Sequence, residues 1–423
     1  MRFNRGKRYT YYSSYSPSRH PRIRWDRIAI IGIVVAIVIG VIVWFNFSRI
    51  QLAFKGYSFS QQSEILALEN NEVDEILSYD KLEHISQWLS QSQKVQYYDE
   101  YEKYLSLHKD MQVKEVISTI DNIFDNYVPK LTTLNYSNDQ IWEVLKTAGV
   151  NEVKHLVDKQ YTYAQIEPFM QVKGFVFEDI DQYMESYEEN KNYNYAVLIT
   201  TYPFIISENE VDQPYTIQNP DDVLTLVKKG FYLPANYEPS DLVNPDPDKV
   251  KVASDCDDPR LRKEAANALV EMFDAAKKEG YDLVVNSAYR SYTDQKATYD
   301  DYFNKYDPVT AASLVAEPGG SEHQTGLGVD LTCQAVIDDK LNGIENSRFG
   351  YKPDYKWCVA NSYKYGFILR YEEDKAGITG IANEPWHFRY VGKEAAKEIF
   401  NNGWTLEEYC LNKGVIPDIK KGQ

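Results

Sequence analysis

The chain has few of the residues that hold metal ions through sulfur. Only 4 of its 423 residues are cysteines, and no two of them form the Cys-x-x-Cys pair that sulfur-ligated zinc sites use. This spacing disfavours a cysteine-based zinc site. An even number of cysteines outside the cytoplasm would instead favour disulfides, with three pairings open. We expect Cys333 to pair with Cys358, the two nearest in sequence among Cys256, Cys333, Cys358 and Cys410.

Positive charge is scarce everywhere except at the start of the chain. The whole chain carries a net charge of −17. Residues 1–27 hold eight basic side chains against Asp26 alone, a charge of +7, which leaves −24 for the rest. Because phosphate binding needs a cationic face, so acidic a body excludes a nucleic-acid partner.

Residues 28–47 form an uncharged, apolar run, IAIIGIVVAIVIGVIVWFNF, of the length that a helix needs to cross a bilayer. Trp25 and Trp44 lie where interfacial aromatic residues belong. A cleaved signal peptide is the alternative, but its apolar stretch would be shorter and would end in small residues. Since the basic tail 1–27 precedes the run, we expect a single-pass membrane protein with a cytoplasmic N-terminus and an extracellular body.

Residues 48–207 contain two diverged copies of a repeat of about 80 residues. The first copy begins YSFSQQSEIL at Tyr57, and the second begins YSNDQIWEVL at Tyr136. Further along, the segment around Tyr104 corresponds to the segment around Tyr183. Serine and asparagine at the starts of apolar-periodic stretches predict short helices. This all-α region is a spacer above the membrane, or it binds a protein or cell-wall partner.

Residues 208–423 form the expected chemical domain, with an extended proline-rich N-terminal segment and a core at about 256–412. In the core we predict a helix from Pro259 to Gly280 and a buried strand in YDLVVNSAY. A helix capped by Thr293 and a helix from Pro308 follow. Strands in FILRY and WHFRYV precede a last helix in KEAAKEIF. Helices and strands mix without regular βαβ alternation, so the predicted fold is α+β.

The histidines of this domain each have a carboxylate close in sequence. Asp330 follows His323, and Glu384 precedes His387 by three residues. Three nitrogen or oxygen ligands and one open position typify catalytic zinc sites, and His323, Asp330 and His387 would supply the three. Glu384 would then serve as the base, provided that Pro385 turns it back toward the metal. The alternative is a hydrogen-bonded core pair without a metal.

Two glycines and three further histidines complete this interpretation. Gly326 and Gly328 allow the tight turn that lets His323 and Asp330 face one ion. The histidines of the helical region lie on separate polar stretches, and we interpret them as surface residues: His84, His108 and His155.

The segments SEHQTGLGVDL and NEPWHFRYVG, with SAYRSYTDQ upstream, resemble the VanY family of zinc D-alanyl-D-alanine carboxypeptidases. That family shares its fold with VanX-type dipeptidases and the hedgehog signalling domain, and the resemblance covers about residues 220–412. It implies that His323, Asp330 and His387 bind one Zn²⁺ ion and that Glu384 is the catalytic base. Gly328 stands where the family usually has alanine, which is also small.

The resemblance also implies a substrate site. Arg290 would hold the substrate carboxylate or the developing oxyanion. An arginine fork suits a free terminal carboxylate, which makes an exopeptidase. Further contacts would come from Tyr289, Gln295, Ser321 and Trp386.

The resulting hypothesis is a membrane-anchored, extracytoplasmic zinc carboxypeptidase that removes a C-terminal D-alanine from peptidoglycan stem peptides. We expect a D,D-carboxypeptidase. An L,D-carboxypeptidase that acts on tetrapeptides remains open, because relatives with these motifs include both. A non-catalytic surface binding or sensor protein that uses the helical repeats is the alternative of another class. The resemblance and the anchor together imply a Gram-positive cell surface.

Overall fold

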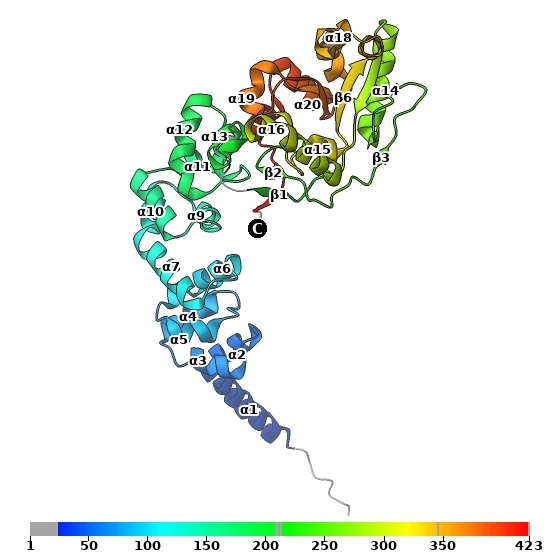
Figure 1. Ribbon diagram of the computed structural model, residues 1–423. Helices are drawn as coiled ribbons and strands as arrows, with labels where there is room; N and C mark the ends of the chain where they lie inside the picture. Colours follow the sequence, from blue (N-terminus) through cyan, green and yellow to red (C-terminus); the bar gives the residue numbers. More distant parts are fainter. Residues whose placement is uncertain (1–23, 208–210, 212–213, 345–346, 422–423) are drawn as a thin grey trace, which may run out of the picture. The chain divides into compact units, whose positions relative to one another are not determined.

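The structure is a computed structural model that describes residues 24–207, 211, 214–344 and 347–421 (Figure 1). Most of the predicted basic tail therefore lies outside the described residues. Contacts divide the chain into two compact units, residues 1–130 with 142–150 and residues 131–141 with 151–423. The boundary expected at residue 207 lies inside the second unit, and that division of the chain stays a prediction.

Helix α1 (Trp25–Phe45) covers most of the predicted membrane segment. None of its side chains is buried, and its length and composition are those of a helix that can cross a membrane. The helix stops two residues before the expected end because Asn46 caps it, donating a side-chain hydrogen bond of 2.8 Å to the Ile42 carbonyl. Helix α2 (Phe47–Phe54) begins at the next residue.

The region 48–207 is helical, as predicted, and five helices of its first half recur in the same order in its second half. The helix α8 (Val128–Thr133) lies between the two sets. The first set is α3 (Phe59–Ile65), α4 (Asn70–Ser78), α5 (Ile85–Gln91), α6 (Tyr98–Leu107) and α7 (Val113–Asn126). The second set is α9 (Asn138–Leu145), α10 (Val150–Lys159), α11 (Tyr163–Met170), α12 (Ile180–Asn190) and α13 (Tyr193–Thr201).

Matching hydrogen bonds recur in the two sets. Ser58 and Gln61 bond reciprocally at the start of α3, and Ser137 and Gln140 do the same at the start of α9. In each set a buried tyrosine hydroxyl bonds the backbone 25 residues later: the Tyr57 hydroxyl accepts from the Leu82 amide, and the Tyr136 hydroxyl donates to the Tyr161 carbonyl.

The expected correspondence of Tyr104 with Tyr183 is wrong by one helical turn. Tyr183 is the fourth residue of α12, and the fourth residue of α6 is Tyr101. Tyr101 and Tyr183 are both fully buried. The first three helices of the second copy are each one residue longer than their counterparts, so the spacing between equivalent residues grows from 79 at Tyr57 and Tyr136 to 82 at Tyr101 and Tyr183.

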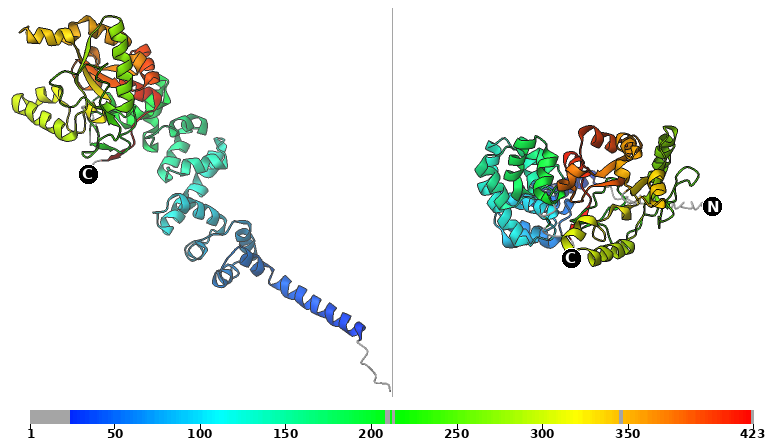
Figure 2. Two further views of the ribbon diagram at one scale, coloured as in Figure 1. Left: turned by 90° about the vertical axis from the view of Figure 1, so that its right-hand side faces the viewer. Right: turned by 45° about the horizontal axis from the view of Figure 1, so that its top comes forward.

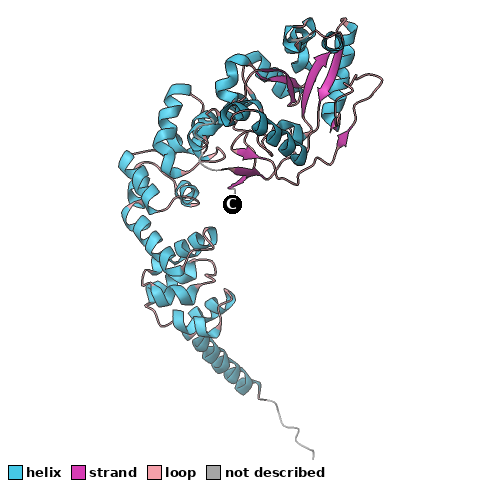
Figure 3. Cartoon of the chain, in the orientation of Figure 1, coloured by secondary structure: helices cyan, strands magenta, loops and turns pink. Residues whose placement is uncertain are grey.

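The C-terminal part is built around one antiparallel sheet, in agreement with the predicted α+β fold (Figure 3). The strand order is β5-β6-β8-β7, and every neighbouring pair is antiparallel. The strands are β5 (Leu283–Ser287), β6 (Gly328–Cys333), β8 (Glu384–Tyr390) and β7 (Phe367–Tyr371). Helix α14 (Lys263–Lys278) presents Leu269 and Phe273 to a core that includes Val329 and Phe388 from the central strands.

Two predicted helix starts differ from the structure. Helix α14 begins at Lys263 instead of near Pro259, because Leu261–Arg262 pair with Leu242–Val243 as the short strands β4 and β3. Helix α15 (Tyr292–Lys305) is capped by Ser291, whose hydroxyl accepts a hydrogen bond from the Asp294 amide, and Thr293 lies inside it. The remaining helices are α16 (Pro308–Leu314), α17 (Gln334–Leu341), α18 (Pro353–Asn361), α19 (Ala376–Thr379), α20 (Lys393–Asn402) and α21 (Leu406–Lys413).

Within the second unit, the last helices of the repeat region contact the C-terminal end of the chain. Helix α13 packs against α21, and Asn192 donates hydrogen bonds to Asn412. Lys173 forms an ion pair with Asp418, just before β9 (Ile419–Lys421), which pairs with β1 (Tyr215–Ile217) beside β2 (Phe231–Tyr232). Both views in Figure 2 show the C-terminal segments, in red, beside the last helices of the repeat region, in green.

All four cysteines are free thiols in the described residues, so the predicted Cys333–Cys358 disulfide is wrong. Both side chains belong to the apolar core that covers the sheet. Burial raises the pKa of both thiols, which keeps them neutral. They act as small apolar side chains, and no cross-link is needed to hold this core.

Replacing Phe388 by alanine tests this core. Phe388 is fully buried in the central strand β8, so Phe388→Ala should lower the free energy of unfolding by about 3–5 kcal/mol. Denaturant titration measures the change. Leu341 is 80% exposed at the end of α17, and Leu341→Ala should change the same quantity by less than about 0.5 kcal/mol. Equal effects of the two substitutions would contradict this placement of the core.

Candidate active site

The sheet register brings three predicted ligands together. Asp330 in β6 lies directly opposite His387 in β8, and Ser287 of β5 lies opposite Asp330 on the other side. His323 lies on the short 3-10 helix η5 (Glu322–Thr325), which joins β6 through Gly326. Gly326 has a φ of 65°, and a Cβ there would lie 2.7 Å from Leu242, so this turn requires glycine.

The three side chains are buried around a common point. Their ligand atoms lie within 4.8 Å of one another. The Asp330 Oδ1 atom is 3.0 Å from His387 Nδ1 and 3.5 Å from His323 Nε2. A Cβ at Gly328 would lie 3.2 Å from His387 Cε1. The glycine that departs from the family pattern therefore gives the His387 ring extra room.

Hydrogen bonds on the far side of each ring fix which nitrogen faces this point. His323 Nδ1 lies 2.5 Å from the Ala288 carbonyl and therefore carries the proton, which leaves Nε2 as the free ligand atom. His387 Nε2 lies 3.3 Å from the Glu322 carboxylate, which leaves Nδ1 to face Asp330 and the common point. Two imidazole nitrogens and one carboxylate oxygen, each held from behind, are the donor set of a catalytic zinc site.

Glu322 belongs to a fully buried network of charges. Its carboxylate lies 2.9 Å from Arg370 Nε and 3.1 Å from Arg389 Nη1. Arg370 also binds Glu407 through both terminal nitrogens, at 3.0 and 2.8 Å. Burial opposes ionisation of Glu322, but the two arginines outweigh it and hold the pKa of this carboxyl well below its usual range. The side chain that supports His387 is therefore a permanent anion.

This support has a consequence for metal binding. Burial lowers the pKa of His387, but its hydrogen bonds to Asp330 and Glu322 outweigh burial and raise that pKa to about 9. A metal that binds through Nδ1 of this ring therefore displaces a proton at neutral pH.

The sequence interpretation missed this network. Glu322 stands between two motif residues, and Arg370 and Arg389 stand in the segments FILRY and WHFRYV. An arginine inside a short strand that is otherwise apolar or aromatic was the available signal, because such a side chain needs a buried anion as partner.

The other predicted site residues mostly line one pocket beside the triad. The pocket has a volume of about 180 Å³. Arg290 donates hydrogen bonds to Gln295 (3.0 Å) and to Ser287 (3.3 Å), so its guanidinium is fixed from one side. Tyr371, which was not predicted, contributes a buried ring 5.0 Å from that of His387. The predicted residues on the wall are Arg290, Gln295, Ser321, Glu384 and Trp386.

Tyr289 is the exception among the predicted substrate contacts. It is not among the described residues that line the pocket, and it is 6% exposed. Its ring packs under the Arg260 guanidinium at 5.2 Å. Tyr289 and Arg290 are consecutive, so their side chains point different ways, and only Arg290 lines the pocket.

Glu384 reaches the pocket through an irregularity in β8. Leu369 pairs with Phe388, but Tyr371, two residues later in β7, pairs with Glu384, four residues earlier in β8. The strand β8 therefore contains a β-bulge between these two pairs. Pro385, which has no N–H to give to the ladder, lies in this bulge. The strand thus continues through the expected break. Burial raises the pKa of Glu384 to about 7, with Asp330 acting in the same direction and His387 opposing it.

Residues 258–393 match the family described as VanY, D-alanyl-D-alanine carboxypeptidase. YodJ of Bacillus subtilis is 51% identical over 201 residues, 47% of this chain and 71% of YodJ. The chain belongs to the VanY family.

Other VanY relatives differ in length and name. The bifunctional D-Ala-D-Ala dipeptidase and carboxypeptidase VanXYC of Enterococcus gallinarum is 36% identical over 188 residues, 44% of this chain and 93% of VanXYC. A D-alanyl-D-alanine carboxypeptidase of Enterococcus faecalis is 41% identical over 150 residues, 33% of this chain and 52% of that protein. Among solved structures, the LdcB LD-carboxypeptidase is 50% identical, covers 48% of this chain and 92% of its own, and has a TM-score of 0.43.

Membership of this family confirms the predicted enzyme class, a carboxypeptidase. A VanY structure in complex with Zn(II) is 35% identical over 44% of this chain, with a TM-score of 0.36. The donor set of His323, Asp330 and His387 fits a zinc ion, the predicted cofactor.

Neutralising Glu322 tests the support of His387. Glu322→Gln should weaken Zn²⁺ binding by about 10–100-fold, because the ring loses its anionic partner. Competition with a chelator measures the affinity. Glu398 pairs with Lys413 at the surface, so Glu398→Gln should leave Zn²⁺ affinity unchanged. A Glu322→Gln protein that binds Zn²⁺ as tightly as the unmodified chain would show that Glu322 does not support the ligand.

Proposed function

We propose that this chain removes a C-terminal D-alanine from peptidoglycan stem peptides. The observation that carries the proposal is the convergence of Glu384 and Arg290 on the pocket that also holds the metal-binding triad. A buried carboxylate and a fixed guanidinium beside one metal site are the parts that hydrolysis of a terminal peptide bond needs.

Arg290 binds the free carboxylate of the terminal D-alanine. Its hydrogen bonds to Gln295 and Ser287 keep the guanidinium in place before substrate arrives, so little ordering is needed on binding. A guanidinium recognises a carboxylate through two parallel hydrogen bonds, which selects a chain end over an internal peptide bond.

Glu384 is the general base and then the general acid. Its pKa of about 7 lets it hold or release a proton near neutral pH. The carboxylate takes a proton from the attacking water and returns it to the amine of the leaving D-alanine. Zn²⁺, held by His323, Asp330 and His387, supplies Lewis-acid polarisation and charge stabilisation when bound. Trp386 and Tyr371 line the same pocket.

The proposed substrate is the pentapeptide that ends in D-Ala–D-Ala, as the names of the enterococcal relatives indicate. The tetrapeptide that ends in Lys–D-Ala is the second candidate. It is kept as a candidate because the LdcB LD-carboxypeptidase, 50% identical to this chain, is named for that activity. D-Alanine release from each pure peptide decides between a D,D- and an L,D-carboxypeptidase.

Helix α1 supports a location outside the cytoplasmic membrane. We propose that α1 anchors the chain with its basic N-terminus in the cytoplasm, so that the carboxypeptidase part faces the wall of a Gram-positive cell. The helical region then spans the gap to the substrate, or contacts a protein or wall partner.

Replacing the proposed base separates catalysis from metal binding. Glu384→Gln should lower kcat for D-alanine release by about 10²–10⁴-fold, because proton transfer is lost. Zinc content by elemental analysis should stay at one ion per chain, since Glu384 is not one of the three ligands. Glu398→Gln, at the surface beside Lys413, is the matched control and should keep full kcat. No D-alanine release by the zinc-loaded, unmodified chain from either peptide would falsify the proposed activity.

The pH profile follows from the ionisation of Glu384. The base works only when ionised, so kcat/KM should be lost as the pH drops through its pKa. That pKa is about 7 without the metal, and a bound dication lowers it. The acidic limb should therefore lie at or below pH 7, with one proton involved, in rate measurements between about pH 5 and about pH 9. Activity that increases on acidification below pH 7 would contradict this role.

A further inference from the structure

A second pocket, larger than the catalytic one, lies on the other side of Trp386. Its volume is about 540 Å³, and Pro385 and Trp386 of β8 form part of its wall. Trp386 is 42% exposed and lines both pockets. Because Glu384 and His387 flank these two residues in the same strand, a peptide whose last bond lies at the catalytic centre can extend its preceding residues into this second pocket.

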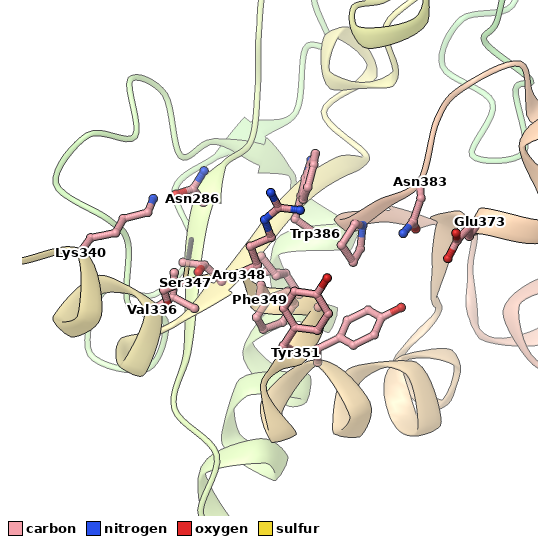
Figure 4. A pocket seen from close by; sticks show the side chains of 15 residues that line it. Asn286, Val336, Lys340, Ser347, Arg348, Phe349, Tyr351, Glu373, Asn383 and Trp386 are labelled. Atoms are coloured by element: carbon pink, nitrogen blue, oxygen red, sulfur yellow. The ribbon is translucent and has the colours of Figure 1, made fainter. Parts of the chain in front are cut away.

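The wall opposite β8 is firmly packed. The 3-10 helix η6 (Phe349–Tyr351) contacts the strand at Pro385, where a Cβ on Gly350 would lie 3.1 Å from Pro385 Cγ. Phe349 is 5% exposed and belongs to the core. The packing of η6 therefore holds the backbone of Arg348, the residue before η6, in place. Figure 4 shows its guanidinium pointing toward the Trp386 ring.

This pocket carries positive charge in an acidic chain. Arg348 and Lys340 both line it, and neither has an ion-pair partner among the residues that the structure describes. The acids of α17 are already bound, Asp338 by Gln334 and Asp339 by Ser347 and Lys352. Glu373 is the one carboxylate among the described lining residues, and Figure 4 shows it at the opposite end, beside Asn383.

Among the residues that the structure describes, Arg348 has no carboxylate within ion-pair distance, although the chain carries a net charge of −17. We infer that the pocket between Trp386 and η6 binds the peptide on the amino side of the scissile bond, and that Arg348 binds a free carboxylate of that peptide, with Lys340 adding attraction. The inference rests on the proposed function for the identity of the peptide. It makes Arg348 a specificity residue that distinguishes free carboxylates from amidated ones in the stem peptide.

Two tripeptides test the inference without any cleavage. Both end at the lysine residue and so have no D-alanine to lose; one carries the free carboxylate of its glutamate, and the other carries the amide at that position. Calorimetry on the zinc-loaded chain should give about tenfold tighter binding of the free-carboxylate tripeptide, since hydrogen bonds to charged groups are strong. In Arg348→Gln this preference should vanish through weaker binding of that tripeptide alone, and the preference of the unmodified chain should shrink at high salt.

Glu373→Gln is the matched control, because it removes a charge of opposite sign from the same pocket. It should not weaken binding of the free-carboxylate tripeptide. Equal affinity of the unmodified chain for the two tripeptides, or a preference that persists in Arg348→Gln, overturns the inference. Absence of D-alanine release from both the tetrapeptide and the pentapeptide overturns the proposed function instead, while the tripeptide affinities still decide the role of Arg348.

Discussion

The site depends on the burial of one carboxylate, Asp330, between two imidazole rings. A carboxylate loses its hydration when it is buried, and it stays ionised only if hydrogen bonds and opposite charges replace the water. Here His323 and His387 outweigh the burial and hold the pKa of Asp330 far below its usual range. The register of β6 and β8 sets this arrangement, because it places Asp330 directly opposite His387. A slip of one residue would send both side chains to the other face of the sheet.

The second constraint concerns strand β8, which must hydrogen-bond to both of its neighbours in the sheet and also form a wall of the catalytic pocket. Regular alternation would separate Glu384 from His387, which is three residues away. The bulge around Pro385 removes this conflict. It lets Glu384 and Trp386 line the pocket that holds His387, and the packing of Gly350 on Pro385 holds the bulge. The irregular part of the sheet is thus the part that brings together the proposed base Glu384, the proposed ligand His387 and the pocket wall.

Much of this arrangement could be predicted from the sequence. The ligands and the base were predicted from short motifs and their spacing, Arg290 was predicted from the resemblance to the VanY family, and strands such as FILRY follow from local composition. The buried partners could not be found in this way. Glu322, Arg370 and Glu407 are far apart in sequence, and they meet only when β7, η5 and α21 pack together. The prediction that Tyr289 contacts the substrate pocket was wrong for a related reason, because proximity to Arg290 in sequence does not determine the direction of its side chain.

The same buried charges connect the metal site to segments far from it. Glu407 of α21 lies 3.6 Å from Lys228, whose ammonium group donates hydrogen bonds to the Ile205 and Ile378 carbonyls. Arg389 donates to the Val223 and Thr225 carbonyls. Two arginines therefore hold the carboxylate that supports His387. Arg389 connects it directly to the segment before the sheet, and Arg370 connects it through Glu407 and Lys228 to the end of the helical region. Removing one member would leave buried charges without partners, at a cost of about 3–5 kcal/mol. The extended segment before the sheet is for this reason a structural part of the carboxypeptidase, and a boundary drawn by secondary structure alone would cut through the support of His387, the proposed metal ligand.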